Sequence, residues 1–217
     1  MRTLRTTNTM LGLNEVPVRE QMSSPGFPYL EELTIGVDQR GYFDGMDDQQ
    51  IERILKKSDK LKVLDIRGCK SITDSTLVRL PCWDIEYLYV SGCSVTTSSK
   101  DGLELLVKKW CRTLVDLDIG NTTDNKTVDW AIMALVENED VIRLKKLNLF
   151  GTGVSLKQLT KLLNCCKTLE ILNLTSCRAL PRGMKRMYHN REDVASLTQD
   201  IADGKFDPKD AGSDDDD

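Results

Sequence analysis

Apolar residues recur along this chain in one short spacing, two residues apart in the middle and three residues apart on either side. The stretch LKVLDIRGC places apolar residues at positions 61, 64 and 66, and it ends on Cys69. Positions 64 and 66 have the alternation of a strand, whereas the three-residue gaps suit neither a plain strand nor one face of a helix. A short strand that ends in a sharp turn accounts for the whole spacing.

The same spacing returns along most of the chain. Six copies begin at Leu30, Leu61, Ile85, Leu114, Leu144 and Leu169, and a weaker seventh consists of Met1, Leu4, Thr6 and Thr9. Successive copies begin 24 to 31 residues apart, which is the period of a leucine-rich repeat or slightly beyond it. The sequence therefore predicts an α/β leucine-rich-repeat solenoid of about six to seven repeats. A curved parallel sheet would form its concave side, and helices would form its convex side.

A small polar residue closes each copy. These residues are Thr9, Asp38, Cys69, Cys93, Thr122, Thr152 and Cys177. Such side chains can bond to buried backbone groups where a strand ends, so we expect a structural ladder that includes three of the seven cysteines. Redox or metal chemistry would require thiols from separate repeats to come together. The chain has no CxxC pair and one histidine, His189, which we expect to face solvent.

The segments between the copies have the apolar spacing of helices. Residues 46–60, 98–111, 125–138 and 155–166 each carry one apolar stripe, and a short return after Ser75 ends at Pro81. Trp110 and Trp130 fall in these stripes and are predicted to lie in the core, whereas the sequence leaves the role of Trp83 open.

The pattern divides the chain into three parts. Residues 1–180 form the predicted repeat array, and residues 181–206 form a capping segment whose helix presents Val194, Leu197 and Ile201 to the last repeat. Gly204 is expected to end that helix, and the acidic tail 207–217 is expected to be disordered. Residues 36–46 lengthen one connection; a projecting contact loop and an inert insertion both remain possible for them.

Composition and motifs exclude several kinds of function. The chain has 217 residues, 40% of them hydrophobic, a formal net charge of −4, and no apolar run long enough to span a membrane. It contains no phosphate-binding glycine loop, nucleophile elbow or HExxH motif. We therefore expect a non-catalytic monomer in the cytoplasm or nucleus, with no cofactor, metal, nucleic acid or membrane as partner.

The residues that alternate with the core leucines should face the concave side. The resulting candidate protein-binding face consists of Val63, Asp65, Arg67, Tyr87, Tyr89, Asp116, Asp118, Lys146, Asn148, Phe150, Ile171 and Asn173. Aromatic side chains mixed with both signs of charge are typical of surfaces that bind proteins. We expect Tyr87, Tyr89 and Phe150 to be its apolar anchors, and an unknown protein to be its ligand.

One stretch also resembles a known family. LDIRGCKSITDSTLVRLPC is similar to the cysteine-containing repeats of the F-box/leucine-rich-repeat family, in which a GC turn precedes an IT-D-x-x-L helix start. PGFPYLEEL, LVKKWCRTLVDLDI and LNLTSCRALPRGMKRMY extend the resemblance over residues 1–189.

The resemblance implies a non-catalytic subunit of an SCF-type (Skp1, cullin, F-box) ubiquitin ligase, whose repeats hold the protein to be ubiquitylated. The first residues already fit a repeat strand, so Skp1 and cullin are expected partners only if an F-box lies upstream. The alternative is a stand-alone repeat scaffold or inhibitor with no link to ubiquitin.

Overall fold

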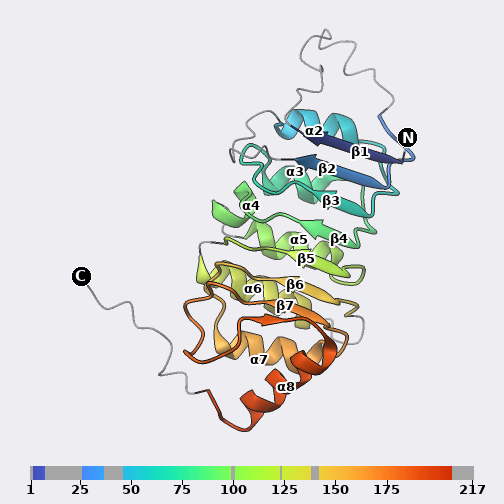
Figure 1. Cartoon of the computed structure of the whole chain (residues 1–217). Coiled ribbons are helices and arrows are strands. Elements are labelled where there is room, and N and C mark those ends of the chain that lie inside the picture. The colour runs from blue at the N-terminus through green and yellow to red at the C-terminus, as the bar shows by residue number, and fades with distance from the viewer. Residues whose placement is uncertain are drawn as a thin grey trace, which may run out of the picture.

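The strands of the chain form one sheet, in which each strand lies next to the one that precedes it in the sequence (Figure 1). The computed structural model describes residues 2–7, 26–36, 46–98, 101–122, 124–137 and 142–206. Within these ranges the strands are β1 (Thr3–Thr7), β2 (Glu32–Gly36), β3 (Val63–Asp65), β4 (Tyr87–Tyr89), β5 (Asp116–Asp118), β6 (Lys146–Asn148), β7 (Ile171–Asn173) and β8 (Met187–Tyr188). The first seven pair in parallel, one per repeat, and β8 runs antiparallel to β7.

Helices return the chain from the end of one strand to the start of the next. They are α2 (Asp48–Leu55), α3 (Asp74–Arg79), α4 (Ser94–Thr97), α5 (Gly102–Trp110), α6 (Asn125–Val136), α7 (Leu156–Cys165) and α8 (Arg191–Ala202). The helices stack along one face of the sheet, with α6 packed between α5 and α7 (Figure 1). The predicted leucine-rich-repeat solenoid is confirmed.

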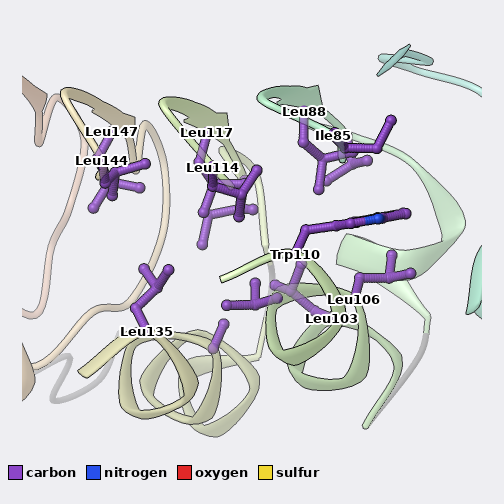
Figure 2. Close-up of a cluster of buried hydrophobic side chains, with 14 of the residues drawn as sticks. Ile85, Leu88, Leu103, Leu106, Trp110, Leu114, Leu117, Leu135, Leu144 and Leu147 are labelled. Atoms are coloured by element: carbon purple, nitrogen blue, oxygen red, sulfur yellow. The ribbon is translucent and has the colours of Figure 1, made fainter. Parts of the chain in front are cut away.

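The repeated apolar positions form the core. The three leucine, isoleucine or valine positions of all six strong copies are at most 1% exposed. Figure 2 shows Leu88, Leu117 and Leu147 of successive strands above Leu106 and Leu135 of the helices. Burying one such side chain contributes about 1.5–3 kcal/mol, so the repeat spacing itself carries most of the stability.

The two tryptophans that were predicted to be buried behave differently. Trp110 is fully buried, and its indole N–H donates to the Cys82 carbonyl at 2.8 Å. Trp130 is 39% exposed, so the prediction for this residue is wrong. The buried residues of α6 are at positions 127, 128, 131, 132, 134 and 135, and position 130 lies at the exposed edge of that face.

Trp83, whose role the sequence leaves open, stacks on a lysine. It is 66% exposed, and the Lys109 ammonium lies 5.1 Å from its ring centroid and 5.0 Å from that of Trp110. The same ammonium donates to the carbonyls of Val78 and Leu80, at 2.7 and 2.6 Å, and so caps the end of α3. Burial lowers the pKa of Lys109, because removal from water disfavours the charged ammonium.

The chain end closes the array. Tyr188 of β8 is buried, and Val194 and Leu197 of α8 pack into the core beside the last repeat. Gly204 follows α8 with a φ of +71°, as the stop signal in the sequence predicts. β8 was not predicted from the sequence. The insertion at 37–45, the turn residues Thr9 and Asp38, and the tail 207–217 lie outside the described residues.

The turns after β3, β4, β5, β6 and β7 each use a left-handed residue immediately before the small polar residue of the ladder. The residues are Gly68, Gly92, Asn121, Gly151 and Ser176, with φ between 57° and 76°. This conformation reverses the chain at the strand end, and glycine adopts it without a steric penalty.

Replacing Gly92 by alanine should destabilise the protein by about 1–2 kcal/mol, which is the cost of a left-handed residue that has a Cβ. The nearest atoms to such a Cβ are 3.9 Å away, so no clash contributes to this cost. Urea denaturation measures the effect. The matched control is Ser176→Gly at the equivalent turn, where the same cost is removed and stability should not fall. Equal stabilities of Gly92→Ala and the wild type would contradict this account of the turns.

Candidate functional site

The strand register sorts most of the predicted binding residues into two rows on the sheet face opposite the helices, which we call the concave face. One row consists of Val63, Tyr87, Asp116, Lys146 and Ile171, and the other of Asp65, Tyr89, Asp118, Asn148 and Asn173. Arg67 and Phe150 follow their strands in the adjoining turns. The structure therefore brings all twelve onto one continuous surface.

Four residues of the second row also hold the turns. The side-chain oxygens of Asp65, Asp118, Asn148 and Asn173 each accept a hydrogen bond from the backbone N–H two residues on, at 3.3, 3.0, 3.0 and 2.9 Å. Asp65 and Asp118 are only 7% and 6% exposed. These side chains therefore order the strand ends, a role that the sequence analysis did not assign to them.

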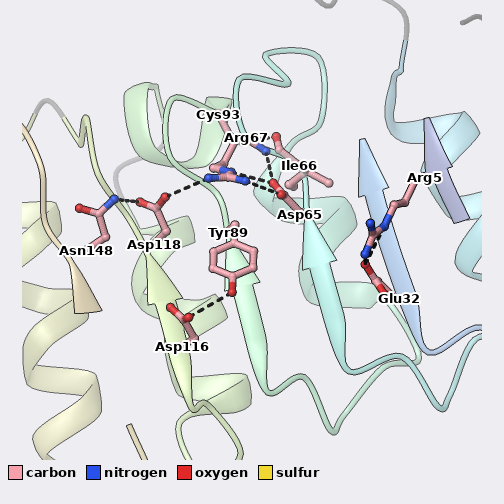
Figure 3. A network of polar contacts seen from close by, with 10 residues as sticks. All are labelled: Arg5, Glu32, Asp65, Ile66, Arg67, Tyr89, Cys93, Asp116, Asp118 and Asn148. Carbon is pink, nitrogen blue, oxygen red and sulfur yellow. Dashed lines mark hydrogen bonds and ion pairs between the residues drawn. The ribbon is translucent and has the colours of Figure 1, made fainter. Parts of the chain in front are cut away.

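Arg67 is fixed at the centre of this face (Figure 3). Its guanidinium binds both carboxylate oxygens of Asp65, at 2.9 and 2.7 Å, and approaches a carboxylate oxygen of Asp118 at 4.0 Å. The guanidinium carbon also lies 5.2 Å from the ring centroid of Tyr89. The hydrogen bond to Asp65 is the main cause that raises the pKa of Arg67. Its side chain is still 53% exposed, so an ordered cation faces solvent.

Tyr89 links Arg67 to a second acidic residue. The Tyr89 hydroxyl donates to Asp116 at 3.1 Å (Figure 3). The Lys146 ammonium lies 3.8 Å from the same carboxylate. Burial raises the pKa of Tyr89, and the charge of Asp116 raises it further. Burial also raises the pKa of Asp116 itself.

Asp118 is tied to the next strand. Its carboxylate accepts from the Asn148 amide at 2.9 Å, and burial raises its pKa (Figure 3). The polar contacts therefore run without interruption from β3 to β6. This arrangement holds no nucleophile paired with a base, and what it offers is an ordered surface of charged and aromatic groups.

The predicted ladder at the turns is confirmed for four residues. The thiols of Cys93 and Cys177 donate to the carbonyls of Ile66 and Leu149 in the preceding repeat, at 2.7 and 3.0 Å. The hydroxyls of Thr122 and Thr152 donate to carbonyls of their own repeats, at 2.6 and 2.8 Å. Cys69 is fully buried at the equivalent position.

A second ladder lies at the other end of the strands, and the sequence analysis missed it. Ser58 donates to the Phe27 carbonyl at 2.9 Å, and Cys82 donates to the Ser58 carbonyl at 3.1 Å. Cys166 also bonds to the preceding repeat, but to the carbonyl of its first apolar residue, Leu144, at 3.4 Å. A signal was present, because each of the three donors stands three places before the first apolar residue of its repeat.

Buried thiols of this kind should be inert. Burial raises the pKa of Cys69 and Cys82 to about 12, and it raises the pKa of Cys166 and Cys177 as well. A thiol with a pKa of about 12 holds only about one part in ten thousand of thiolate at pH 8, and the thiolate is the reactive species.

Iodoacetamide at pH 8 should therefore label half-buried Cys165 of the native chain first and leave the ladder cysteines unmodified. Mass spectrometry of the digested protein reads out each site. The same treatment in urea is the control, in which all seven cysteines should react. Rapid native labelling of Cys69 or Cys82 would contradict their structural role.

The described ranges contain neither a metal-binding cluster nor a helix that could span a membrane. There, no three histidine, cysteine, aspartate or glutamate side chains are grouped as ligands of a metal ion would be. No helix in the part of the chain that the structure describes has the length and apolar character needed to cross a membrane. His189 is exposed, as predicted.

The chain was compared with known proteins. No protein-family model matches it, and no curated protein matches its sequence. Among solved structures it is similar to the tropomodulin C-terminal domain of Caenorhabditis elegans, with a TM-score of 0.46 and 12% sequence identity. The match covers 74% of this chain and 96% of that domain.

Proposed function

We propose that this chain is a protein-binding leucine-rich-repeat module, and that its concave face holds a segment of another protein. The ordered Arg67–Tyr89 pair carries this proposal. Asp65 holds the guanidinium at two points while the tyrosine ring lies against it, and half of the arginine side chain remains exposed. Arginine and tyrosine are enriched among the residues that dominate binding energies.

The network also lowers the cost of binding. An arginine or tyrosine that becomes ordered only in a complex loses side-chain entropy, about 0.5–1.5 kcal/mol for each such residue. Arg67 and Tyr89 are already ordered by Asp65 and Asp116, so a partner would meet a surface that has the bound arrangement. Phe150, which is 38% exposed, adds an apolar contact at the edge of this face.

We further propose that the bound protein is a substrate for ubiquitylation. The support is the resemblance of the repeats to the F-box/leucine-rich-repeat family, including the GC turn. In this chain Gly68 adopts the left-handed turn and Cys69 is buried behind it, so the motif has a clear structural role. In this proposal the chain is the non-catalytic recognition part of an SCF-type ligase in the cytoplasm or nucleus, with Skp1 and cullin reached through an F-box in the full-length protein.

Tyr89→Ala should weaken binding of the partner at least tenfold, because it removes the ring under Arg67 and the hydroxyl that orients Asp116. The partner is first isolated by affinity purification of the full-length protein with the proteasome inhibited, and its affinity is then measured by calorimetry. Tyr89→Phe should lose less, since it keeps the ring.

Tyr29→Ala is the matched control. Tyr29 is also an exposed tyrosine beside a cation, with Lys60 at 5.9 Å from its ring, but it precedes β2 and lies outside the concave face. Unchanged affinity of Tyr89→Ala, with circular dichroism and melting as in the wild type, would rule out the concave face as the binding site.

The ligase role has a separate test. The full-length protein should co-purify with Skp1 and a cullin, and the abundance of its partner should rise when the protein is depleted. Recovery of the partner without Skp1 or cullin would contradict the ligase proposal and favour a stand-alone scaffold or inhibitor.

A further inference from the structure

A polar pocket of about 530 Å³ adjoins the concave face, at the turns that follow β5, β6 and β7. Phe150 belongs to both, since it lines the pocket and also follows the second row of the concave face. A segment bound on the concave face could therefore place one side chain in this pocket.

Two turns that line the pocket depart from the rule of the array. The left-handed position before the ladder residue is glycine at positions 68, 92 and 151, but it is Asn121 and Ser176 in these two turns. Within the described ranges, Asn121 and Ser176 are the two residues other than glycine that have a positive φ. Glycine would adopt this conformation at lower cost. The Asn121 amide offsets part of the cost by donating to the Ser91 hydroxyl at 3.2 Å, whereas Ser176 is exposed. Such strain is characteristic of binding sites.

The pocket also contains a cation without a partner. Of the residues that line the pocket, Arg178 is the one that has a charged side chain, and it is exposed. Within the described part of the chain it makes no ion pair or hydrogen bond. Arg67, by contrast, is bound to Asp65, and Arg186 to the carbonyls of Leu180 and Pro181.

A neighbouring glycine makes room for a hydrogen-bonding amide. A Cβ on Gly153 would lie 1.6 Å from Oδ1 of Asn125, so the Asn125 side chain occupies this place only because residue 153 is glycine. Asn125 is also the first residue of the 12-residue helix α6, whose N-terminus is capped by the Asp124 carboxylate through the Thr127 N–H at 2.7 Å. No carboxylate lines the pocket to offset Arg178.

We propose that this pocket binds an anionic group, either a carboxylate or a phosphate, carried by the protein segment on the concave face. Arg178 pairs with the anion, and the Asn125 amide and Ser176 hydroxyl donate hydrogen bonds to it. The protein context of the anion rests on the proposed function, whereas the pocket's affinity for the anionic group does not.

The test uses the ¹⁵N-labelled chain and three small probes. They are N-acetyl-O-phosphoserine N-methylamide, N-acetylglutamate N-methylamide and the neutral N-acetylglutamine N-methylamide. At least one anionic probe should shift the amide signals of Gly151, Gly153 and Ser176 in a saturable way, and the neutral probe should not. Saturation by the phosphoserine probe alone identifies phosphate as the source, and saturation by both shows that a carboxylate suffices.

Arg178→Gln should weaken the anionic probes at least tenfold. Arg182→Gln is the matched control, because Arg182 is an exposed arginine four residues away that does not line the pocket, and it should leave binding unchanged. Absence of saturable shifts with both anionic probes overturns the proposal. Equal weakening by the two variants also overturns it, since the attraction would then be a general effect of positive charge.

These experiments contain no partner protein, so a negative result would not contradict the proposal that the concave face binds a protein. Conversely, loss of partner binding in Tyr89→Ala says nothing about the pocket, because Tyr89 does not line it.

Discussion

Each repeat depends on burying the middle leucine of its strand between the equivalent leucines of its neighbours. Leu64, Leu88, Leu117 and Leu147 pair in register across β3 to β6, and each is at most 1% exposed. A strand of three residues with one buried apolar side chain has no stability alone, so each repeat needs its neighbours. A slip of one residue would turn the leucine outward and the flanking polar residues into the core. The same register therefore fixes which side chains reach the concave face and which of them become neighbours there.

The turns are the second constraint, because a parallel strand that ends inside the protein leaves backbone groups that water cannot reach. Small donors at both ends of the strands bond to these carbonyls, and Asp65, Asp118, Asn148 and Asn173 bond to the N–H groups of the turns. Asp65 and Asp118 serve two purposes, since one carboxylate holds the turn while it also orients Arg67 or Asn148. The concave face is thus built on side chains that the fold already requires.

The repeat frame could be predicted from the sequence because it depends on local spacing that recurs. The positions of the strands, the principal helices and the thiol ladder all followed from it. What could not be predicted depends on contacts between repeats. The stacking of Lys109 between Trp83 and Trp110 joins segments that no periodic rule connects. β8 has two residues, which are too few to form a recognisable sequence pattern. Trp130 lies one position away from the buried stripe of α6. For the face itself, the sequence predicted which residues would share it, but not that Asp65 and Asp118 would be buried within it.

The polar network on the concave face contributes more to the ordering of its side chains than to the stability of the fold. Arg67 is half exposed, and ion pairs of this kind contribute about 0–1 kcal/mol because water screens them and the side chains lose entropy. Burial raises the pKa of Asp116 and Asp118, so their surroundings disfavour the charged carboxylates rather than stabilise them. What the polar arrangement supplies is a fixed direction for each hydrogen bond and charge, and that is the property by which a binding surface distinguishes one partner from another.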